Sequence, residues 1–367
     1  MPLQAGIVGM PNVGKSTLFN ALTETRNAEA SNYPFCTIEP NVGTIIVPDH
    51  KLDELFKVYK SKKVVPSTME FVDIAGLVKG ASKGEGLGNQ FLSHIREVDA
   101  IIHIVRCFDD DNIIHVDNEI NPESDIQTVE TELILKDIET IEKRLDKIRK
   151  AVRTGEKSLA KEVEILDGLK AHLDSGRLAR YYTINLHPDD RNITHYMHLL
   201  SDAPVLYVAN VDEAGVSGNA YSDKVKEIAE KEGAKFLILS VQIESEIANL
   251  ETKEDKAEFL KDLGLEESGL SRLVKEAYKL LDLITFFTAN EKELHSWTIQ
   301  HGLKAPEAAG KIHTDIEKGF IRAEIMKYKD LIEYGSEQAV KEKGMLHVEG
   351  KDYVVEDGDI TYFRFNV

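Results

Sequence analysis

The sequence of 367 residues is poor in cysteine and contains two, Cys36 and Cys107. Two cysteines do not make a disulfide framework, so we expect a reducing compartment, the cytoplasm. No run of about 18 apolar residues occurs, and this excludes a membrane-spanning helix. The first residues read as a strand and lack a charged-then-apolar leader, so we expect no secretion signal.

Basic residues are also scarce relative to acidic ones. The chain has 45 Lys and Arg against 64 Asp and Glu, a net charge of −19. This balance opposes general binding to polyanions, so any contact with nucleic acid needs a local basic patch. The length is sufficient for two or three domains, and 42% hydrophobic residues is ordinary for a globular protein.

Residues 9–17 read G-M-P-N-V-G-K-S-T and fit the phosphate-loop pattern G-x-x-x-x-G-K-[S/T]. An apolar strand at 3–8 precedes them and a helix opens at 17–22, which argues against a chance match. In such a loop, backbone N–H groups and the helix dipole bind phosphates. We expect Lys15 to reach the β- and γ-phosphates and the Ser16 hydroxyl to bind Mg²⁺.

A second nucleotide motif follows the strand at 69–72. Asp73 and Gly76 fit D-x-x-G, so Asp73 is expected to hold a Mg²⁺-bound water and the Gly76 amide to sense the γ-phosphate. Thr37, in the proline-containing loop 31–40, lies where nucleotide switches keep a second Mg²⁺ ligand. An ordinary loop threonine is the alternative for Thr37.

The position after Gly76 is Leu77, where many switch proteins have a water-orienting glutamine. Leucine cannot hold a water, so catalysis needs another polar group. His94, His103 and His115 are the candidates, and each has a purely structural alternative. His115 follows a strand at 99–108, at the rim where open α/β sheets bind ligands, so we predict His115 and Lys15 as the catalytic pair. The glycine-rich stretch 79–90 is either a mobile switch or a flexible surface loop.

Residues 210–213 read N-V-D-E where switch GTPases carry N-K-x-D. Adenine has no N1–H and no 2-amino group, so the usual carboxylate clamp on guanine has nothing to grip. The amide of Asn210 can still bond N7 and the 6-amino group, with Val211 beside the base. We therefore predict ATP in preference to GTP, with Glu213 and Ser240 also near the nucleotide.

Nearly a hundred residues separate the strand at 99–108 from the next one at 204–210, which predicts an insertion. From Ile134 to Val152 apolar residues recur at 4-3-4-3-4 spacing, and the pattern resumes from Leu159 to Leu173. This spacing predicts an antiparallel helical hairpin with a coiled-coil seam. Its tip is rich in cations, either a solvated face or a contact for a phosphate backbone: Lys143, Arg144, Lys147, Arg149, Lys150, Arg153, Lys157 and Lys161.

From residue 283 onward, short β-prone runs replace the earlier pattern, at 285–288, 320–325, 352–355 and 360–365. They predict a compact α+β unit. The expected fold is therefore an α/β P-loop domain over 1–282, interrupted by a helical arm at 123–200, and a separate C-terminal domain over 283–366.

Together these residues resemble the YchF-type, Obg-related P-loop ATPases over essentially the whole chain. The most specific matches are 9–17, 33–40, 73–77, the glycine-rich stretch through Gln90, and 308–315. The resemblance implies a G domain, a coiled-coil arm and a ubiquitin-like (β-grasp) TGS domain, with ATP preferred over GTP. It implies Mg²⁺ binding by Ser16 and Thr37, and it matches His115 to the family histidine. It assigns the ATP contacts to Asn12, Val13, Gly14, Lys15, Ser16, Thr17 and Val211.

The resemblance also implies association with ribosomes, with the cleft between arm and TGS domain as a proposed nucleic-acid site. The leading hypothesis is a slow, monomeric, Mg²⁺-dependent ATPase whose nucleotide state controls docking on a ribosomal or RNA partner, in translation or stress control. The alternatives are a GTP-preferring translational GTPase, a P-loop small-molecule kinase, and a binding module in which hydrolysis is incidental.

Overall fold

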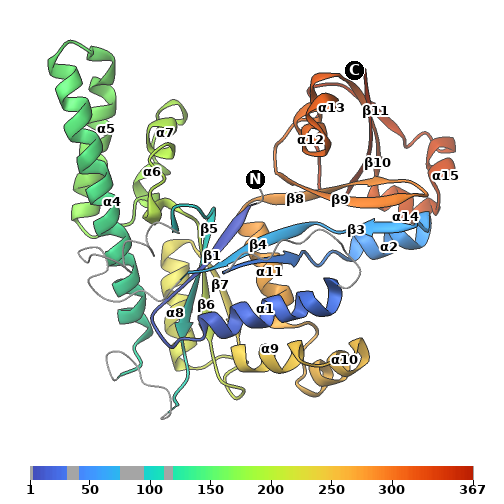
Figure 1. Cartoon of the computed structure of the whole chain (residues 1–367), viewed down its shortest axis with the longest axis horizontal. Coiled ribbons are helices and arrows are strands. Elements are labelled where there is room, and N and C mark those ends of the chain that lie inside the picture. The colour runs from blue at the N-terminus through green and yellow to red at the C-terminus, as the bar shows by residue number, and fades with distance from the viewer. Residues whose placement is uncertain (1–2, 31–40, 75–94, 111–118, 367) are drawn as a thin grey trace. The chain divides into compact units, whose positions relative to one another are not determined.

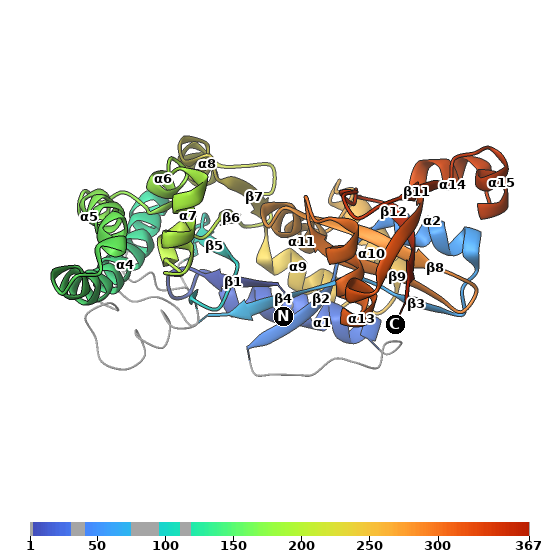
Figure 2. The same cartoon turned by 90° about the horizontal axis from the view of Figure 1, so that it is seen from above.

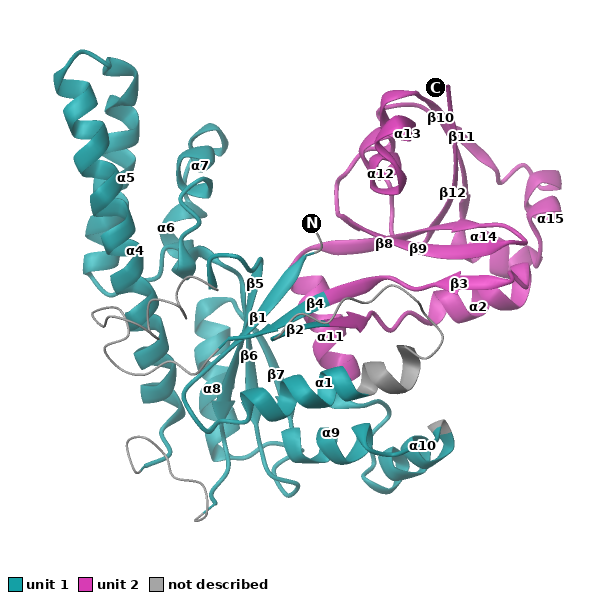
Figure 3. Ribbon diagram, viewed as in Figure 1, with its two compact units in different colours: residues 1–25, 38–43, 70–269 teal, residues 26–37, 44–69, 270–367 magenta. Residues whose placement is uncertain are grey.

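The computed structural model describes residues 3–30, 41–74, 95–110 and 119–366. The chain divides into two compact units (Figure 3). The first unit comprises residues 1–25, 38–43 and 70–269, and the second comprises 26–37, 44–69 and 270–367. Within the described residues, no helix has both the length and the apolar character needed to cross a bilayer.

The first sheet has the strand order β2-β4-β1-β5-β6-β7. β1 pairs in parallel with β4 and β5, and β5, β6 and β7 continue the parallel pairing, as predicted. β5 and β6 are buried along their whole length, as expected for parallel strands covered on both faces. The strands are β1 (Gln4–Val8), β2 (Val42–Ile46), β4 (Thr68–Asp73), β5 (Ala100–Arg106), β6 (Val205–Asn210) and β7 (Lys235–Leu239).

Helices follow the strands of this sheet, and two of them have clear start signals. Asn219 forms a capping box at the start of α8, and the Ser240 side chain caps α9. The helix after the phosphate loop begins at Lys15, two residues earlier than the sequence indicates. The helices that follow strands are α1 (Lys15–Ala30), α8 (Ala220–Glu232), α9 (Val241–Ala248), α10 (Lys253–Asp262) and α11 (Gly269–Leu280).

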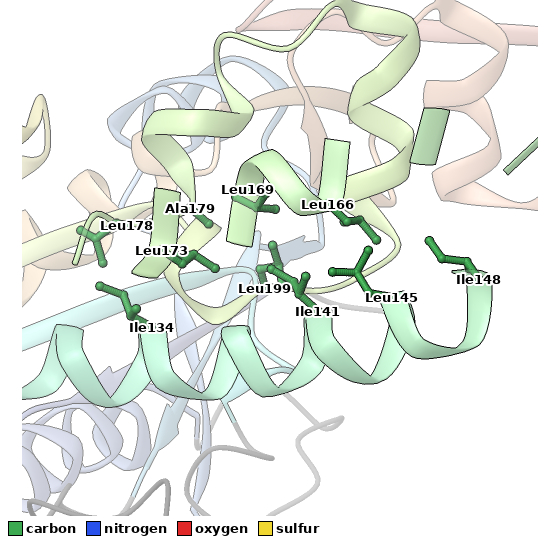
Figure 4. Close-up of a cluster of buried hydrophobic side chains, with 10 residues drawn as sticks. All are labelled: Ile134, Ile141, Leu145, Ile148, Leu166, Leu169, Leu173, Leu178, Ala179 and Leu199. Carbon is green, nitrogen blue, oxygen red and sulfur yellow. The ribbon is translucent and has the colours of Figure 1, made fainter. Parts of the chain in front are cut away.

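The inserted segment contains two long helices, α4 (Pro122–Arg153) and α5 (Ala160–Asp174), joined through the short 3₁₀ helix η1 (Lys157–Leu159). They lie side by side (Figure 1, Figure 2). α4 contributes Ile134, Ile141, Leu145 and Ile148 to their shared apolar cluster (Figure 4), as the spacing predicts. After α5 come α6 (Arg180–Thr183), α7 (Pro188–His195) and the 3₁₀ helix η2 (Leu200–Asp202). The supercoiling of this pair stays a prediction.

The second unit contains a mixed sheet with the strand order β11-β10-β12-β8-β9-β3. β8 pairs antiparallel with β9 and parallel with β12, and β10 pairs antiparallel with β12. The elements are α2 (His50–Tyr59), β3 (Lys63–Val65), β8 (Leu283–Ala289), β9 (Glu293–Gln300), α12 (Ala305–Ile312), α13 (Thr314–Lys318), β10 (Phe320–Lys327), α14 (Tyr328–Tyr334), α15 (Glu337–Glu342), β11 (His347–Glu349) and β12 (Asp359–Phe365).

Two features of this sheet differ from the sequence reading. The run 352–355 forms an isolated bridge from Val354 to Lys304, and the strand lies earlier, at β11. β3 pairs in parallel with β9, through Lys63 with Glu293 and Val65 with His295. β3 lies within 1–282, the range predicted for the first domain, yet this pairing makes it an edge strand of the second sheet, while residues 44–46 belong to β2 of the first sheet.

Candidate nucleotide-binding site

The phosphate loop lies between the end of β1 and the start of α1. A Cβ on Gly9 would lie 2.4 Å from the carbonyl oxygen of Ile104. At Gly14 the backbone φ is +102°, and a Cβ would lie 2.7 Å from Nδ2 of Asn210. Glycine at these two positions therefore allows the loop to lie directly against the ends of β5 and β6.

Lys15 is buried at the centre of this loop, with 7% of its surface exposed. Its Nζ donates a hydrogen bond of 2.6 Å to the carbonyl oxygen of Met10. Burial lowers the pKa of Lys15 to about 8, and the nearby Asp73 carboxylate opposes part of this shift. The Lys15 ammonium is thus held within the phosphate loop, where it would stabilise a bound anion most strongly.

Asn210, at the end of β6, braces the loop from the opposite side. Its Nδ2 donates to the carbonyl oxygen of Val13 over 2.9 Å, and its Oδ1 accepts from the Val241 amide over 3.0 Å. The side chain is 4% exposed. One N–H of the Asn210 carboxamide is therefore hydrogen-bonded within the protein, and the other can donate to a ligand.

A cavity of about 860 Å³ opens beside the loop, within the usual size range of ligand pockets. Five of the predicted site residues line it: Asn12, Gly14, Thr17, Asn210 and Val211. Asp212 lines the described cavity, whereas Glu213 is exposed and lies outside the lining. Ser240 acts as the cap of α9, accepting from the Ile243 amide.

The cavity has further walls that the sequence reading missed. Phe108, Asp109 and Asp110 follow β5, α9 contributes Gln242, Ser245 and Glu246, and Asn249 comes directly after the end of α9. The general rule that the carboxyl ends of parallel strands meet at one edge of the sheet points to the residues after β5. No motif marks the α9 residues.

Arg106, the last residue of β5, fixes the wall formed by Phe108. It is 2% exposed, and its guanidinium donates to the carbonyl oxygens of Phe108 and Asp110, each over 3.1 Å. Its central carbon lies 4.9 Å from the centre of the Phe108 ring. The two hydrogen bonds from the guanidinium therefore fix the backbone conformation of residues 108–110, directly after β5.

Ser16 and Asp73 lie together at the mouth of the loop. The Ser16 hydroxyl donates to Oδ2 of Asp73 over 3.1 Å. Among the described residues, Oδ1 of Asp73 is a buried acceptor without a hydrogen-bond partner. Burial raises the pKa of Asp73, an effect that Ser16 and Lys15 oppose. A buried carboxylate oxygen lacking a donor, beside a hydroxyl, fits a hard divalent cation such as Mg²⁺.

The described part of the chain holds no group of three or more His, Cys, Asp or Glu side chains able to bind a metal. In nucleotide sites, Mg²⁺ commonly takes most of its ligands from water and phosphate oxygens.

Four of the predicted functional positions, Thr37, Gly76, His94 and His115, lie outside the described residues. His103 is described and lies within β5, 3% exposed, with its ring 5.4 Å from that of Tyr207. Burial lowers its pKa to about 3, so the imidazole is neutral. It is not among the residues that line the described cavity.

Comparison with known proteins supplies the family. A model described as "50S ribosome-binding GTPase" matches residues 4–149, and the YchF-GTPase C-terminal model, described as a protein of unknown function, matches 283–366. The chain is 52% identical to the Ribosome-binding ATPase YchF of Bacillus subtilis, and the match covers all of both chains. The chain belongs to the YchF family. The corresponding protein of Escherichia coli is 50% identical, again over the full length of both.

A solved structure agrees. The YchF GTPase of Schizosaccharomyces pombe matches with a TM-score of 0.89 and 40% identity, over 99% of this chain and 98% of that one. The predicted family and the predicted α/β P-loop fold are confirmed. The predicted domain limits, the site residues and their roles stay predictions.

Proposed function

We propose that this YchF-family protein hydrolyses ATP in a Mg²⁺-dependent reaction and that its nucleotide state controls binding to the ribosome. The observation that carries the proposal is the cavity beside the phosphate loop, lined by Asn210 and Val211 where GTPases have asparagine and lysine. The relatives in B. subtilis and E. coli carry the name Ribosome-binding ATPase. We further propose that the protein acts in the cytoplasm as a monomer.

In this proposal the loop amides and the start of α1 bind the phosphates, and Lys15 neutralises charge that develops on the γ-phosphate. Ser16, Asp73 and Thr37 would hold Mg²⁺, which neutralises phosphate charge when bound. The Gly76 amide senses the γ-phosphate, and His115 orients the attacking water because Leu77 cannot. Without the usual glutamine, we expect slow turnover.

Base preference rests on the residues after β6. The second N–H of Asn210 can donate to N7, an acceptor that adenine and guanine share. The preference therefore rests on Val211, which is 2% exposed at the cavity wall and stands where GTPases have the lysine. Glu213 is the predicted carboxylate of this motif, and its exposed position supports the view that it does not clamp a guanine.

A GTP-preferring enzyme is the second candidate, because Asp212 supplies a carboxylate at the cavity and the S. pombe relative is titled a GTPase. Titration of both nucleotides, with Asp212→Ala alongside, separates the two. We expect tighter ATP binding, little changed by the substitution. GTP binding at least tenfold tighter than ATP, lost in Asp212→Ala, would establish the second candidate instead.

The contact with the ribosome is proposed at the tip of the arm and on the C-terminal TGS region. Four of the eight basic tip residues are engaged: Arg144 with Glu162, Arg149 with Asp167, Lys161 with Asp190, and Lys143 with Glu139. Within the described chain the other four are exposed and form no ion pair: Lys147, Lys150, Arg153 and Lys157. These four are the cations available to phosphate groups of RNA.

Co-sedimentation with ribosomes in ATP, in ADP and without nucleotide tests the proposal. The variant Lys150→Glu/Arg153→Glu should pellet less than the wild type, most clearly at low salt, and the difference should shrink as salt rises because the variant makes fewer phosphate contacts. Lys231→Glu/Lys261→Glu, on α8 and α10, is the matched control with the same charge change on exposed lysines. Pelleting that is equal for all proteins and all nucleotide states would refute both the switch and the basic tip.

A further inference from the structure

A second hollow, of about 340 Å³, lies in the first unit, away from the nucleotide cavity. Residues 95–99, just before β5, form one side, and the end of α7 with η2 forms the other. We call it the histidine hollow, because His195 and His198 both line it and both are exposed. Their ring centres lie 6.1 Å apart, and Tyr196, beside them, is 77% exposed with its ring 6.2 Å from His195.

Buried hydrogen bonds hold the wall of the histidine hollow in place. Asp137 of α4, fully buried, accepts from the amides of Leu200 and Ser201 over 2.8 Å and from the Ser201 hydroxyl over 2.6 Å. From α6, Thr183 donates to Asp202 over 2.5 Å. The wall is therefore fixed by two neighbouring helices before any ligand arrives, which lowers the entropic cost of binding.

The backbone at His198 carries a second sign of a constrained site. Its φ is +46°, in the left-handed region that few non-glycine residues adopt. Such strain persists only where the surroundings impose it, and it concentrates at functional sites. Here it turns the chain between α7 and η2 so that both imidazoles line the same hollow.

The side chains match the chemistry of an unpaired nucleobase. The imidazole rings of His195 and His198 can stack on bases, and the guanidinium of Arg96, which also donates to Thr140, lies at the rim. Asp99 and Asp202 supply carboxylate oxygens that accept from exocyclic amino groups.

We propose that the histidine hollow binds one unstacked base of single-stranded RNA, with His195 and His198, which both line it, as the stacking surface. This proposal rests on the proposed association with the ribosome and names the RNA element that the first unit recognises. It differs from the basic arm tip, which contacts phosphates and therefore does not distinguish single strands from duplexes.

Fluorescence anisotropy of the full-length protein tests this, with labelled single-stranded oligoadenylate and a blunt RNA duplex as probes. His195→Ala should weaken single-strand binding about fivefold or more, and His195→Phe should retain it, because stacking needs an aromatic ring and not the ring nitrogens. Duplex binding should not change. His187→Ala, an exposed histidine outside the hollow, is the matched control, and unchanged ATP binding checks the fold.

The outcomes distinguish the proposed base site from the proposed association with the ribosome. If His195→Ala and His198→Ala bind the single strand as the wild type does, or lose single-strand and duplex binding equally, the histidine hollow is not a base site. If in addition Lys150→Glu/Arg153→Glu loses ribosome pelleting, the proposed function stands without it. No binding of single-stranded RNA by the wild-type protein would also overturn the proposal.

Discussion

Replacing Asn210 by alanine tests the side chain that links the phosphate loop to α9. Its carboxamide ties the phosphate loop, through the Val13 carbonyl, to the start of α9, through the Val241 amide. Alanine keeps the strand and removes both bonds. Because Asn210 is 4% exposed, water does not easily replace them.

The size of the effect follows from the two groups left behind. An unsatisfied buried carbonyl or amide costs about 1–3 kcal/mol, so we expect a loss of roughly 3 kcal/mol in the free energy of unfolding. The loop must then be ordered when ATP binds, and the proposed N–H contact to the base is also lost. A tenfold weaker affinity, about 1.4 kcal/mol, is the least we expect.

Urea denaturation gives the first quantity and titration with a fluorescent ATP analogue gives the second. Asn192→Ala, an exposed asparagine on α7, is the control for the change of residue type. If Asn210→Ala unfolds within about 0.5 kcal/mol of the wild type and binds ATP equally well, the bracing role is refuted.

Three further results follow from the same structure. Because burial lowers the pKa of Lys15 in the free protein to about 8, Lys15 must take up a proton when ATP binds above that pH, and the affinity for ATP should fall as pH rises past 8. Calorimetry in buffers of different ionisation enthalpy measures the proton uptake, and Lys15→Arg should abolish the pH dependence. Asp137→Ala leaves three buried donors unpaired and should lower the free energy of unfolding by about 3 kcal/mol, whereas a loss under about 1 kcal/mol in urea denaturation would mean that η2 is held by other contacts. Arg106→Met should weaken ATP at least fivefold while leaving inorganic triphosphate binding unchanged, because Arg106 shapes the Phe108 wall and not the phosphate loop; equal losses for both ligands in parallel titrations would contradict this.

The sequence predicts the local parts of the site well. The strand, glycine turn and helix around Lys15 are encoded within about twenty consecutive residues, and the apolar spacing of the arm is equally local. The ion pairs of Arg144 and Arg149 were not predictable, because they depend on which residues of α5 lie opposite α4. Because such ion pairs neutralise part of the charge, the basic residues of the sequence predict a more strongly basic tip than the structure has.

Positions that depend on how distant strands meet could not be predicted. The bond from Asn210 to Val13 spans 197 residues, and no motif states that this asparagine braces the loop. The cavity wall from α9 depends on where the chain turns after β7, so it carries no signature of its own. Glu213 fits the base-reading pattern by position, but the turn after β6 places Asp212 at the cavity.

The pairing of β3 with β9 has a consequence for the order of synthesis. Lys63 and Glu293 are 230 residues apart, so a growing chain presents β3 long before its partner exists. At usual elongation rates that interval is roughly 10–50 s. During it, an edge strand stays unpaired outside the exit tunnel, and the second sheet closes only once nearly the whole message has been read.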